Sequence, residues 1–296
     1  MVNAILAKRV NHIVTKGDNP AWPKGSKSRG FSMIPEFAIR EWGEQVPWTE
    51  TEQVEQDLLI CRALTEIYKD PYLASHLAFR GGTALHKLFL SPQPRYSEDI
   101  DLVQVKAEPI KETYDRIREA LSFLGEPKVK QKKHNNTLIF RLESEIIPVV
   151  PIHLKVEINC KEHFNVLPMQ EVPFSVSNKW YNGECHVLTY QLDELVGTKL
   201  RALYQRRKGR DLYDLYKALT LSDVNIAHVL ACYQKYMEFV VDHVPTYKEF
   251  IINMEDKMQD DEFLGDTKQL LRPDEEFNPH KGYEVVRTLL IDRLQK

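Results

Sequence analysis

Two aspartates one residue apart are the side chains of this sequence best suited to chemistry. Asp99 and Asp101 lie in an alternating segment, 98–104, in which Ile100 and Leu102 are apolar. Because successive side chains of a strand point to opposite faces, both carboxylates project from one face. Carboxylate oxygens are the ligands that hard divalent cations prefer. Taken alone, the same pattern also fits a charged strand with one face in water.

A third carboxylate, Glu157, lies on the polar side of another alternating segment. Segment 152–159 places apolar residues on one side and His153, Lys155, Glu157 and Asn159 on the other. A pair of cations that activates an attacking oxygen and stabilises a departing phosphate needs about three carboxylates. Glu157 is therefore the expected third metal ligand. The alternative is a solvent-facing residue paired with Lys155 or another neighbour.

A glycine turn precedes the aspartates. The apolar run 77–80 is a predicted strand, Gly81-Gly82-Thr83 follows it, and 84–90 is a predicted helix. Glycine lets a backbone approach a phosphate closely, and a helix N-terminus offers unpaired N–H groups to an anion. On its own, such a turn is more often a tight connection. Followed by two carboxylates, it predicts a phosphate-binding turn that faces a metal site.

A basic run lies further along the chain. Six basic residues and no acid fall between Lys199 and Arg210, so the run could neutralise a triphosphate or bind an RNA backbone. Lys199 and Arg210 share a face if the helix is continuous, but Gly209 makes a break equally plausible. Asp211 and Asp214 follow. Their alternative roles are a helix N-cap for Asp211 and an ordinary ion pair with Lys217 or Arg210 for Asp214.

Hydrophobic periodicity supplies the framework for these residues. Compact structure is expected to begin near Ser32, with Ile34, Phe37, Ile39 and Trp42 as apolar anchors. Predicted helices cover 54–69, 84–90, 113–124, 192–203, 211–219, 224–242, 246–258 and 283–294, and predicted strands cover 77–80, 98–104, 127–133, 137–143 and 152–159.

Composition excludes several classes of protein. The chain has 296 residues, 43% of them hydrophobic, and a net charge of -3, which excludes bulk disorder and a protein that coats nucleic acid by charge alone. The four cysteines are too far apart for a zinc knuckle or a redox pair, so a reducing cytoplasm is expected. The longest apolar stretch, 146–152, contains two prolines and is too short to cross a membrane. The N-terminus lacks the apolar core of a secretion signal.

Charge is distributed unevenly along the chain. Residues 1–30 carry six basic residues and one acidic residue, which predicts a loosely ordered basic arm or a solvated tail without a partner. The stretch 253–276 contains nine acidic and three basic residues and is interpreted as a solvated loop or helix end that a basic partner could use.

Four blocks of this sequence, in order, resemble the AbiEii family of nucleotidyltransferase-like toxins of type IV toxin–antitoxin and abortive-infection systems. They are LAFRGGTALHKLFL (77–90), RYSEDIDLV (95–103), VEIN (156–159) and TKLRALYQRRKGRDLYDLY (198–216). The stretch 33–64 also looks like that family, so the resemblance covers about residues 33–216.

The resemblance implies an α+β fold. A DNA polymerase β-like nucleotidyltransferase domain, a mixed sheet flanked by helices, is expected at 31–185 after the basic arm at 1–30, with a C-terminal helical domain at 186–296. It implies Mg²⁺ or Mn²⁺ and a nucleoside triphosphate (GTP, CTP or UTP). The roles carried over by position are nucleotide binding for Gly81, Gly82, Thr83, Lys87, Ser97, Lys199 and Arg210; metal binding for Asp99, Asp101 and Glu157; and catalysis for Asp99, Asp101, Lys199, Asp211 and Asp214.

The function expected from these features is a cytoplasmic toxin that transfers a nucleotide from a nucleoside triphosphate to an acceptor, the tRNA 3′ end, and releases pyrophosphate. Such transfer would block translation and arrest growth in phage defence. The resemblance also implies a cognate antitoxin encoded nearby. The alternatives are a catalytically inert toxin that binds nucleotide or RNA, and a nucleotidyltransferase that modifies a protein or a small molecule such as an aminoglycoside.

Overall fold

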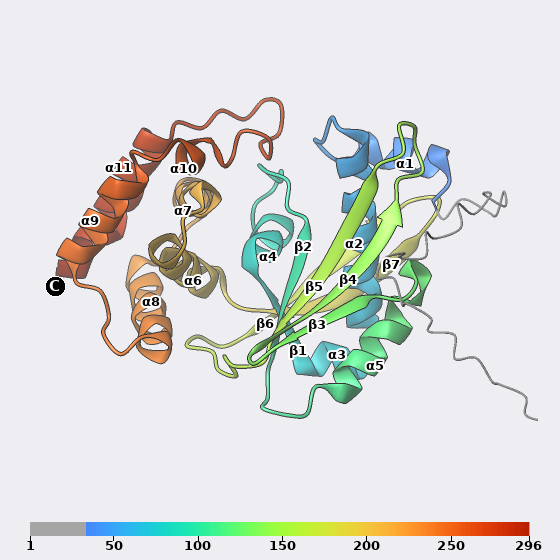
Figure 1. Cartoon of the computed structure of the whole chain (residues 1–296), viewed down its shortest axis with the longest axis horizontal. Coiled ribbons are helices and arrows are strands. Elements are labelled where there is room, and N and C mark those ends of the chain that lie inside the picture. The colour runs from blue at the N-terminus through green and yellow to red at the C-terminus, as the bar shows by residue number, and fades with distance from the viewer. Residues whose placement is uncertain (1–33, 296) are drawn as a thin grey trace, which may run out of the picture. The chain divides into compact units, whose positions relative to one another are not determined.

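A seven-stranded mixed sheet forms the centre of the computed structural model, which describes residues 34–295 (Figure 1). The strand order is β3-β4-β5-β2-β1-β7-β6. The strands are β1 Leu77–Arg80, β2 Asp99–Gln104, β3 Lys128–Lys132, β4 Asn135–Glu143, β5 Pro151–Asn159, β6 Gln170–Ser177 and β7 Asn182–Thr189. The five predicted strands are confirmed. The predicted basic arm at 1–30 lies outside the described residues.

The β6–β7 hairpin was not predicted from the sequence. β6 is an edge strand, and of its residues only Val176 is fully buried. Edge strands need only a weak apolar pattern, because one backbone edge and much of both faces meet water. The usual alternation of a half-buried strand is therefore too faint in β6 to detect.

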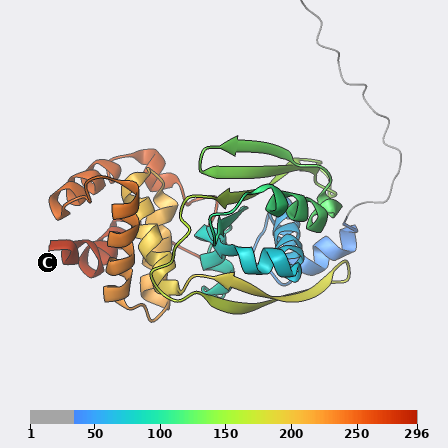
Figure 2. The same ribbon diagram turned by 90° about the horizontal axis from the view of Figure 1, so that it is seen from below.

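One face of the sheet packs against a group of N-terminal helices. Its centre is α2 Thr51–Lys69, which lies between the β3–β4 ribbon and the β6–β7 ribbon in Figure 2. Leu58, Leu59 and Ile60 are fully buried, so this helix buries more than one stripe of its surface. The other members are α1 Glu36–Gly43, α3 Pro71–His76, α5 Lys111–Ala120 and the short η1 Ser122–Leu124.

One residue sets the boundary between α2 and α3. Asp70 ends α2 and caps α3, because its carboxylate accepts hydrogen bonds from the amides of Tyr72 and Leu73.

Of the predicted apolar anchors, Ile34, Ile39 and Trp42 are buried, but the Phe37 side chain is 55% exposed. The prediction that Phe37 anchors the core is therefore wrong, because it falls on the outer face of α1.

The second face carries α4 Gly81–Leu88 and the C-terminal helices, which lie beside α4 in Figure 1. These helices share one apolar core that includes Leu203, Leu212, Tyr233 and Phe250. They are α6 Leu192–Gln205, α7 Gly209–Leu221, α8 Ile226–Val240, α9 Tyr247–Lys257, α10 Asp261–Gly265, α11 Pro279–Leu289 and η2 Ile291–Gln295. All predicted helices are present, and the α+β class with C-terminal helices is confirmed.

The sheet and the C-terminal helices belong to one compact unit. A buried apolar cluster joins them. It consists of Ala78 of β1, Val103 of β2, Tyr190 between β7 and α6, and Leu195 of α6. The expected division of this unit into a nucleotidyltransferase domain and a helical domain near residue 185 stays a prediction. None of the helices in residues 34–295 has the length and apolarity that a membrane crossing requires.

Candidate active site

The three predicted metal ligands lie along one wall of a cavity of about 240 Å³. β2 and β5 pair in parallel, with Asp101 opposite Glu157 and Asp99 opposite Lys155. Residues paired across neighbouring strands share a face and lie about 5 Å apart. The strand pairing therefore brings together carboxylates that are more than 50 residues apart in the sequence.

Asp101 has the fewest direct contacts of the three carboxylates. Burial and the charges of Asp99 and Glu157 outweigh the cations Arg80 and Lys199 and raise the pKa of Asp101 to about 6. Its carboxylate makes no hydrogen bond or ion pair with any residue in 34–295. Asp99 Oδ1 lies 3.3 Å from Lys155 Nζ, and Glu157 accepts a hydrogen bond from Asn135 at 3.2 Å.

This donor set fits a hard divalent cation, because it consists of carboxylate oxygens whose mutual repulsion a cation would relieve. Among residues 34–295, however, no three acidic, histidine or cysteine side chains converge closely enough to form a complete metal site. Asp99 and Glu157 must first turn away from Lys155 and Asn135. The assignment of these ligands therefore remains a proposal.

The glycine turn reaches the same cavity. Gly81 has φ +81°, and a β-carbon added there would lie 2.1 Å from Asp101 Oδ2, so no side chain fits. A β-carbon on Gly82 would lie 2.6 Å from Arg95 Nη2 and 3.5 Å from Lys199 Nζ. The turn thus holds the start of α4 against one carboxylate and two cations.

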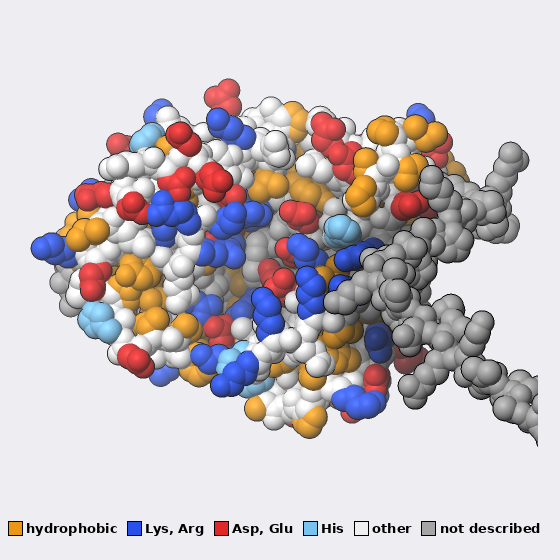
Figure 3. Space-filling view, in the orientation of Figure 1, with side chains coloured by type: hydrophobic (Ala, Val, Ile, Leu, Met, Phe, Trp, Pro, Cys, Tyr) orange, Lys and Arg blue, Asp and Glu red, His pale blue; other side chains and the backbone are white. Residues whose placement is uncertain are grey.

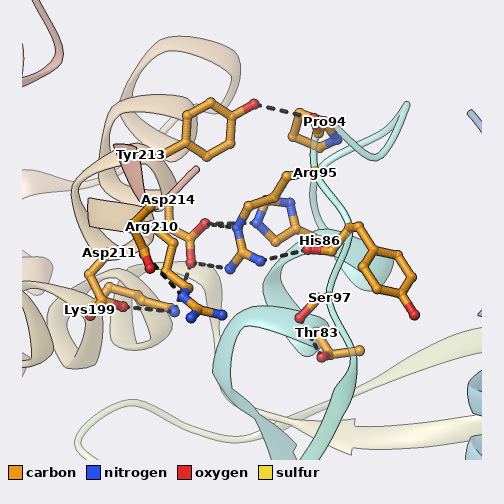
Figure 4. A network of polar contacts seen from close by, with 12 residues as sticks. Thr83, His86, Pro94, Arg95, Ser97, Lys199, Arg210, Asp211, Tyr213 and Asp214 are labelled. Atoms are coloured by element: carbon orange, nitrogen blue, oxygen red, sulfur yellow. Dashed lines mark hydrogen bonds and ion pairs between the residues drawn. The ribbon is translucent and has the colours of Figure 1, made fainter. Parts of the chain in front are cut away.

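Thr83 and Ser97 connect the turn to β2. The Thr83 hydroxyl donates to the Asp99 carbonyl at 2.5 Å, so the Ser97 hydroxyl donates to Thr83 Oγ1 at 2.7 Å (Figure 4). Ser97 lines the cavity, whereas Thr83 is buried and holds the start of β2 in place.

Lys87 is not brought to the cavity. Its ammonium lies 2.7 Å from Asp57 Oδ1 and donates to Cys61 Sγ at 3.3 Å, and the side chain is almost fully buried. Burial disfavours the ammonium, but Asp57 outweighs burial and raises the pKa of Lys87. The interpretation of Lys87 as a nucleotide contact therefore has no support from its position. It connects α4 to α2.

A buried ionic network supplies the positive side of the cavity (Figure 4). Lys199 Nζ lies 3.2 Å from Asp211 Oδ1 and 2.7 Å from Asp214 Oδ2. Arg95 donates two hydrogen bonds to Asp214, at 2.7 and 2.8 Å, and His86 Nε2 lies 2.8 Å from the same carboxylate. Burial opposes ionisation of Asp214, but Arg95 and Lys199 outweigh burial and hold its pKa well below the usual range.

The two aspartates of this network point at cations and away from the cavity. Asp211 and Asp214 are fully buried and do not line it, whereas Lys199 does. Because Lys208 precedes the first residue of α7, Asp211 lies in the first turn and is not the N-cap. Nor does Asp214 pair with Lys217, which contacts Glu275 at 2.6 Å.

Every cation of the basic run has an acidic partner. α6 ends at Gln205 and α7 begins at Gly209, so the run is broken between two helices. Beyond Lys199, the pairs are Arg201 with Glu162, Arg206 with Asp211, Arg207 with Asp256 and Asp260, and Lys208 and Arg210 with Asp266. Part of the acidic stretch 253–276 therefore neutralises the basic run, which corrects its interpretation as a solvated loop.

Arg95 and Arg206 were not among the predicted site residues, although both line the cavity. Arg95 opens the block RYSEDIDLV, and its position two residues before Ser97 was the available signal. Arg206 Nε lies 2.5 Å from Asp211 Oδ2 and also faces a second cavity of about 260 Å³. The two cavities share Gly82, Asp101, Lys199 and Arg206.

Arg210, the remaining predicted nucleotide contact, lines the carboxylate cavity while its guanidinium contacts Asp266 at 3.1 Å. The site thus combines carboxylates on β2 and β5, a glycine turn, and cations. The cations come from the segment that precedes β2, from α6, and from the start of α7 with the loop before it. This combination suits a phosphate ester that arrives with a divalent cation.

Comparisons with solved structures show a related fold. The structure is similar to MenT4, a nucleotidyltransferase toxin from Mycobacterium tuberculosis H37Rv, with a TM-score of 0.59 and 16% identity over 90% of this chain and 94% of that one. A weaker similarity, with a TM-score of 0.46 and 15% identity, links it to a candidate nucleotidyltransferase from H. pylori, over 83% of this chain and 96% of that one. A search of curated proteins finds no match.

A family model described as nucleotidyl transferase AbiEii toxin, type IV TA system, matches residues 62–288. That range contains the glycine turn, the three carboxylates and the Lys199 network. The protein belongs to the AbiEii family of nucleotidyltransferase toxins of type IV toxin–antitoxin systems.

Proposed function

We propose that this toxin transfers a nucleotide from a nucleoside triphosphate to the 3′ end of tRNA in the cytoplasm, in a reaction that depends on Mg²⁺ or Mn²⁺. Translation and growth then stop, as in phage defence, until a cognate antitoxin encoded nearby counteracts the toxin. The observation that carries the proposal is a single cavity with Asp99, Asp101 and Glu157 on one wall and Arg95 and Lys199 on another.

The carboxylates are proposed to hold the divalent cation. Asp101 is the anchor, since its carboxylate has no protein partner among the described residues, and Asp99 and Glu157 complete the set once they leave Lys155 and Asn135. A bound divalent cation supplies charge that stabilises the phosphate oxygens during transfer.

The cations are proposed to bind the triphosphate. Lys199 and Arg95 both reach the cavity, and the absence of a side chain at Gly82 lets Arg95 lie against the glycine turn. Asp211 and Asp214 act as positioning residues, because they fix Lys199 and Arg95 by ion pairs while remaining buried. A preorganised cation needs no rearrangement when negative charge develops on the phosphate.

The test is incubation of the purified protein with unfractionated tRNA, Mg²⁺ and each labelled nucleoside triphosphate in turn. Label should appear on tRNA with at least one nucleotide, and D101N should abolish it. D115N is the matched control, because Asp115 lies on the exposed surface of α5 and, among residues 34–295, pairs only with Lys111. Absence of label on tRNA with all four nucleotides would refute the proposed acceptor.

A second readout tests the toxin itself. Expression in a bacterial host should arrest growth with the wild type and with D115N but not with D101N. Arrest by D101N as well would favour the catalytically inert toxin, because nucleotide transfer would then be unnecessary for toxicity.

A further inference from the structure

The second face of the sheet is only partly covered. α4 and α6 pack over β1 and β2, where Ala78, Val103 and Leu195 are buried together. The same face continues across β5, β4 and β3, where many polar side chains are exposed or half-buried. Asp99 and Asp101 lie at the boundary between the covered part and the open part.

The strand register shows which side chains share this open face. Asp101 is opposite Glu157, which is opposite Thr137, which is opposite Lys130. Three neighbouring rows lie on the same face. One runs from Asp99 of β2 through Lys155 and Ile139 to Lys128. Another pairs Asn159 of β5 with Asn135 and Lys132, and the last pairs His153 of β5 with Arg141. The two rows that begin at Asp101 and Asp99 lead from the proposed metal site to Lys130 and Lys128.

The basic side chains at the outer end of these rows have no acidic partner. Lys128, Lys130, Lys132 and Arg141 are exposed and form no ion pair with any residue in 34–295. In Figure 3, Lys and Arg side chains lie among acidic ones across the middle of the view, over the region where Figure 1 shows α4, α6 and the strands β3, β4 and β5. We call Lys128, Lys130, Lys132 and Arg141 the open basic face.

We propose that the open basic face binds the phosphate backbone of an RNA acceptor and directs its end to the carboxylates on β2 and β5. This inference rests on the proposed function. Lys130 lies three strand spacings from Asp101, about 14 Å across the sheet. The face is therefore close enough for an acceptor end in the cavity and phosphates further along the same strand to be bound together.

The chemistry of the face favours nucleic acid over a protein. Protein interfaces are depleted of lysine and enriched in aromatic residues at their centres. The side chains that β3, β4 and β5 present on this face include no Phe, Tyr or Trp, and the most apolar of them, Ile139, is only 9% exposed. Without stacking platforms, contacts are made to phosphates and are independent of sequence.

Protection of a sheet edge is the other reason for lysines on β3, because this strand is at the edge and charged side chains prevent pairing with another chain. Edge protection also applies to Arg141, because β3 pairs with β4 only as far as Ile139 and Arg141 lies beyond that point. The salt dependence of RNA binding therefore separates the two roles, because edge protection alone predicts no loss of RNA contacts.

The test measures binding of unfractionated tRNA as a function of salt, without nucleotide or divalent metal, for the wild type, R141Q and K128Q/K130Q/K132Q. The slope of log K against log salt is negative, and each lost phosphate contact makes it shallower by about 0.7 to 0.9. The slope should therefore become shallower by about 2 to 3 in the triple variant and by about 1 in R141Q. K128R/K130R/K132R should restore the wild-type slope.

The matched control is K179Q/K248Q/K281Q, which makes the same change in net charge. These lysines are exposed, form no ion pair with a described residue and belong to the β6–β7 turn, α9 and α11. The control should keep the wild-type slope. Equal slopes for the two triple variants, or no tRNA binding by the wild type, would overturn the proposal.

Nucleotide transfer on the same preparations separates this inference from the proposed function. If the wild type binds tRNA with the expected slopes but transfers no nucleotide to it, the proposed function fails and the RNA-binding face stands. If the wild type labels tRNA while both triple variants bind it equally, the face is refuted and the transferase stands. Transfer of labelled nucleotide to a protein, together with an unchanged salt slope of tRNA binding in K128Q/K130Q/K132Q, would also refute the RNA-binding role of the open basic face.

Discussion

Replacement of Asp101 by asparagine should stabilise the metal-free protein, although Asp101 belongs to the proposed site. Burial, with Asp99 and Glu157, raises the pKa of Asp101 from 3.8 to about 6. The folded protein therefore holds this proton more tightly than the unfolded chain does. The corresponding stability is present below pH 3.8 and is lost as the pH rises through 6.

The magnitude follows from the shift. A pKa difference of about 2 units, at about 1.4 kcal/mol for each unit, corresponds to about 3 kcal/mol in the free energy of unfolding. Asparagine keeps the shape of the side chain and removes the charge. The free energy of unfolding of D101N should therefore exceed that of the wild type by up to about 3 kcal/mol at pH 8. At pH 4 the two free energies should be almost equal.

The assay is urea denaturation in EDTA at pH 8, 6 and 4, with D115N as the control. D115N should leave the free energy of unfolding nearly unchanged, because it breaks one exposed ion pair that solvent screens. Added Mg²⁺ should stabilise the wild type and leave D101N unchanged. A D101N variant that is less stable than the wild type at pH 8, or equally stabilised at pH 4, would refute the reasoning.

Three further substitutions test the buried charges and the turn. D214N should lower the free energy of unfolding by about 3 to 5 kcal/mol in urea denaturation, because Arg95 would lose its buried partner. E162Q should cost about 3 kcal/mol at pH 7 and progressively less below pH 4.5, since two arginines outweigh burial and lower the pKa of Glu162 to about 2. G82A should weaken nucleoside triphosphate binding in calorimetry, because the added methyl group lies 2.6 Å from Arg95 Nη2. G265A, whose methyl group meets nothing within 4 Å, should leave that binding unchanged.

The carboxylates of the site could be predicted because their pattern is local. Alternation in 98–104 and 152–159 is enough to put Asp99 with Asp101 on one face and Glu157 on a polar face. The pairing of Asp101 with Glu157 is different, because β2 and β5 are joined in parallel by two intervening strands and a helix. Nothing local fixes such a register, so their proximity needed the structure.

The basic run shows why charge could not be interpreted from the sequence alone. Arg207 pairs with Asp256 and Asp260, which lie 49 and 53 positions away, and Arg210 pairs with Asp266 at a separation of 56. A local count of charges treats these cations as free. Folding places the acidic stretch beside them, whereas Lys128, Lys130, Lys132 and Arg141 on β3 and β4 form no ion pair with a described residue.

The buried network also changes what the two aspartates of α7 can do. Asp214 contacts Arg95, Lys199 and His86 at once. Burial alone would raise the pKa of Asp214, but Arg95 and Lys199 outweigh burial and hold this pKa well below the usual range. A carboxylate with a lowered pKa is a weak base at neutral pH, which argues against a general-base role for Asp214. Of Lys199, Asp211 and Asp214, only Lys199 lines both cavities. We therefore propose that Lys199 is the cation of α6 that meets the phosphate, and that the two acids of α7 hold Lys199 in place.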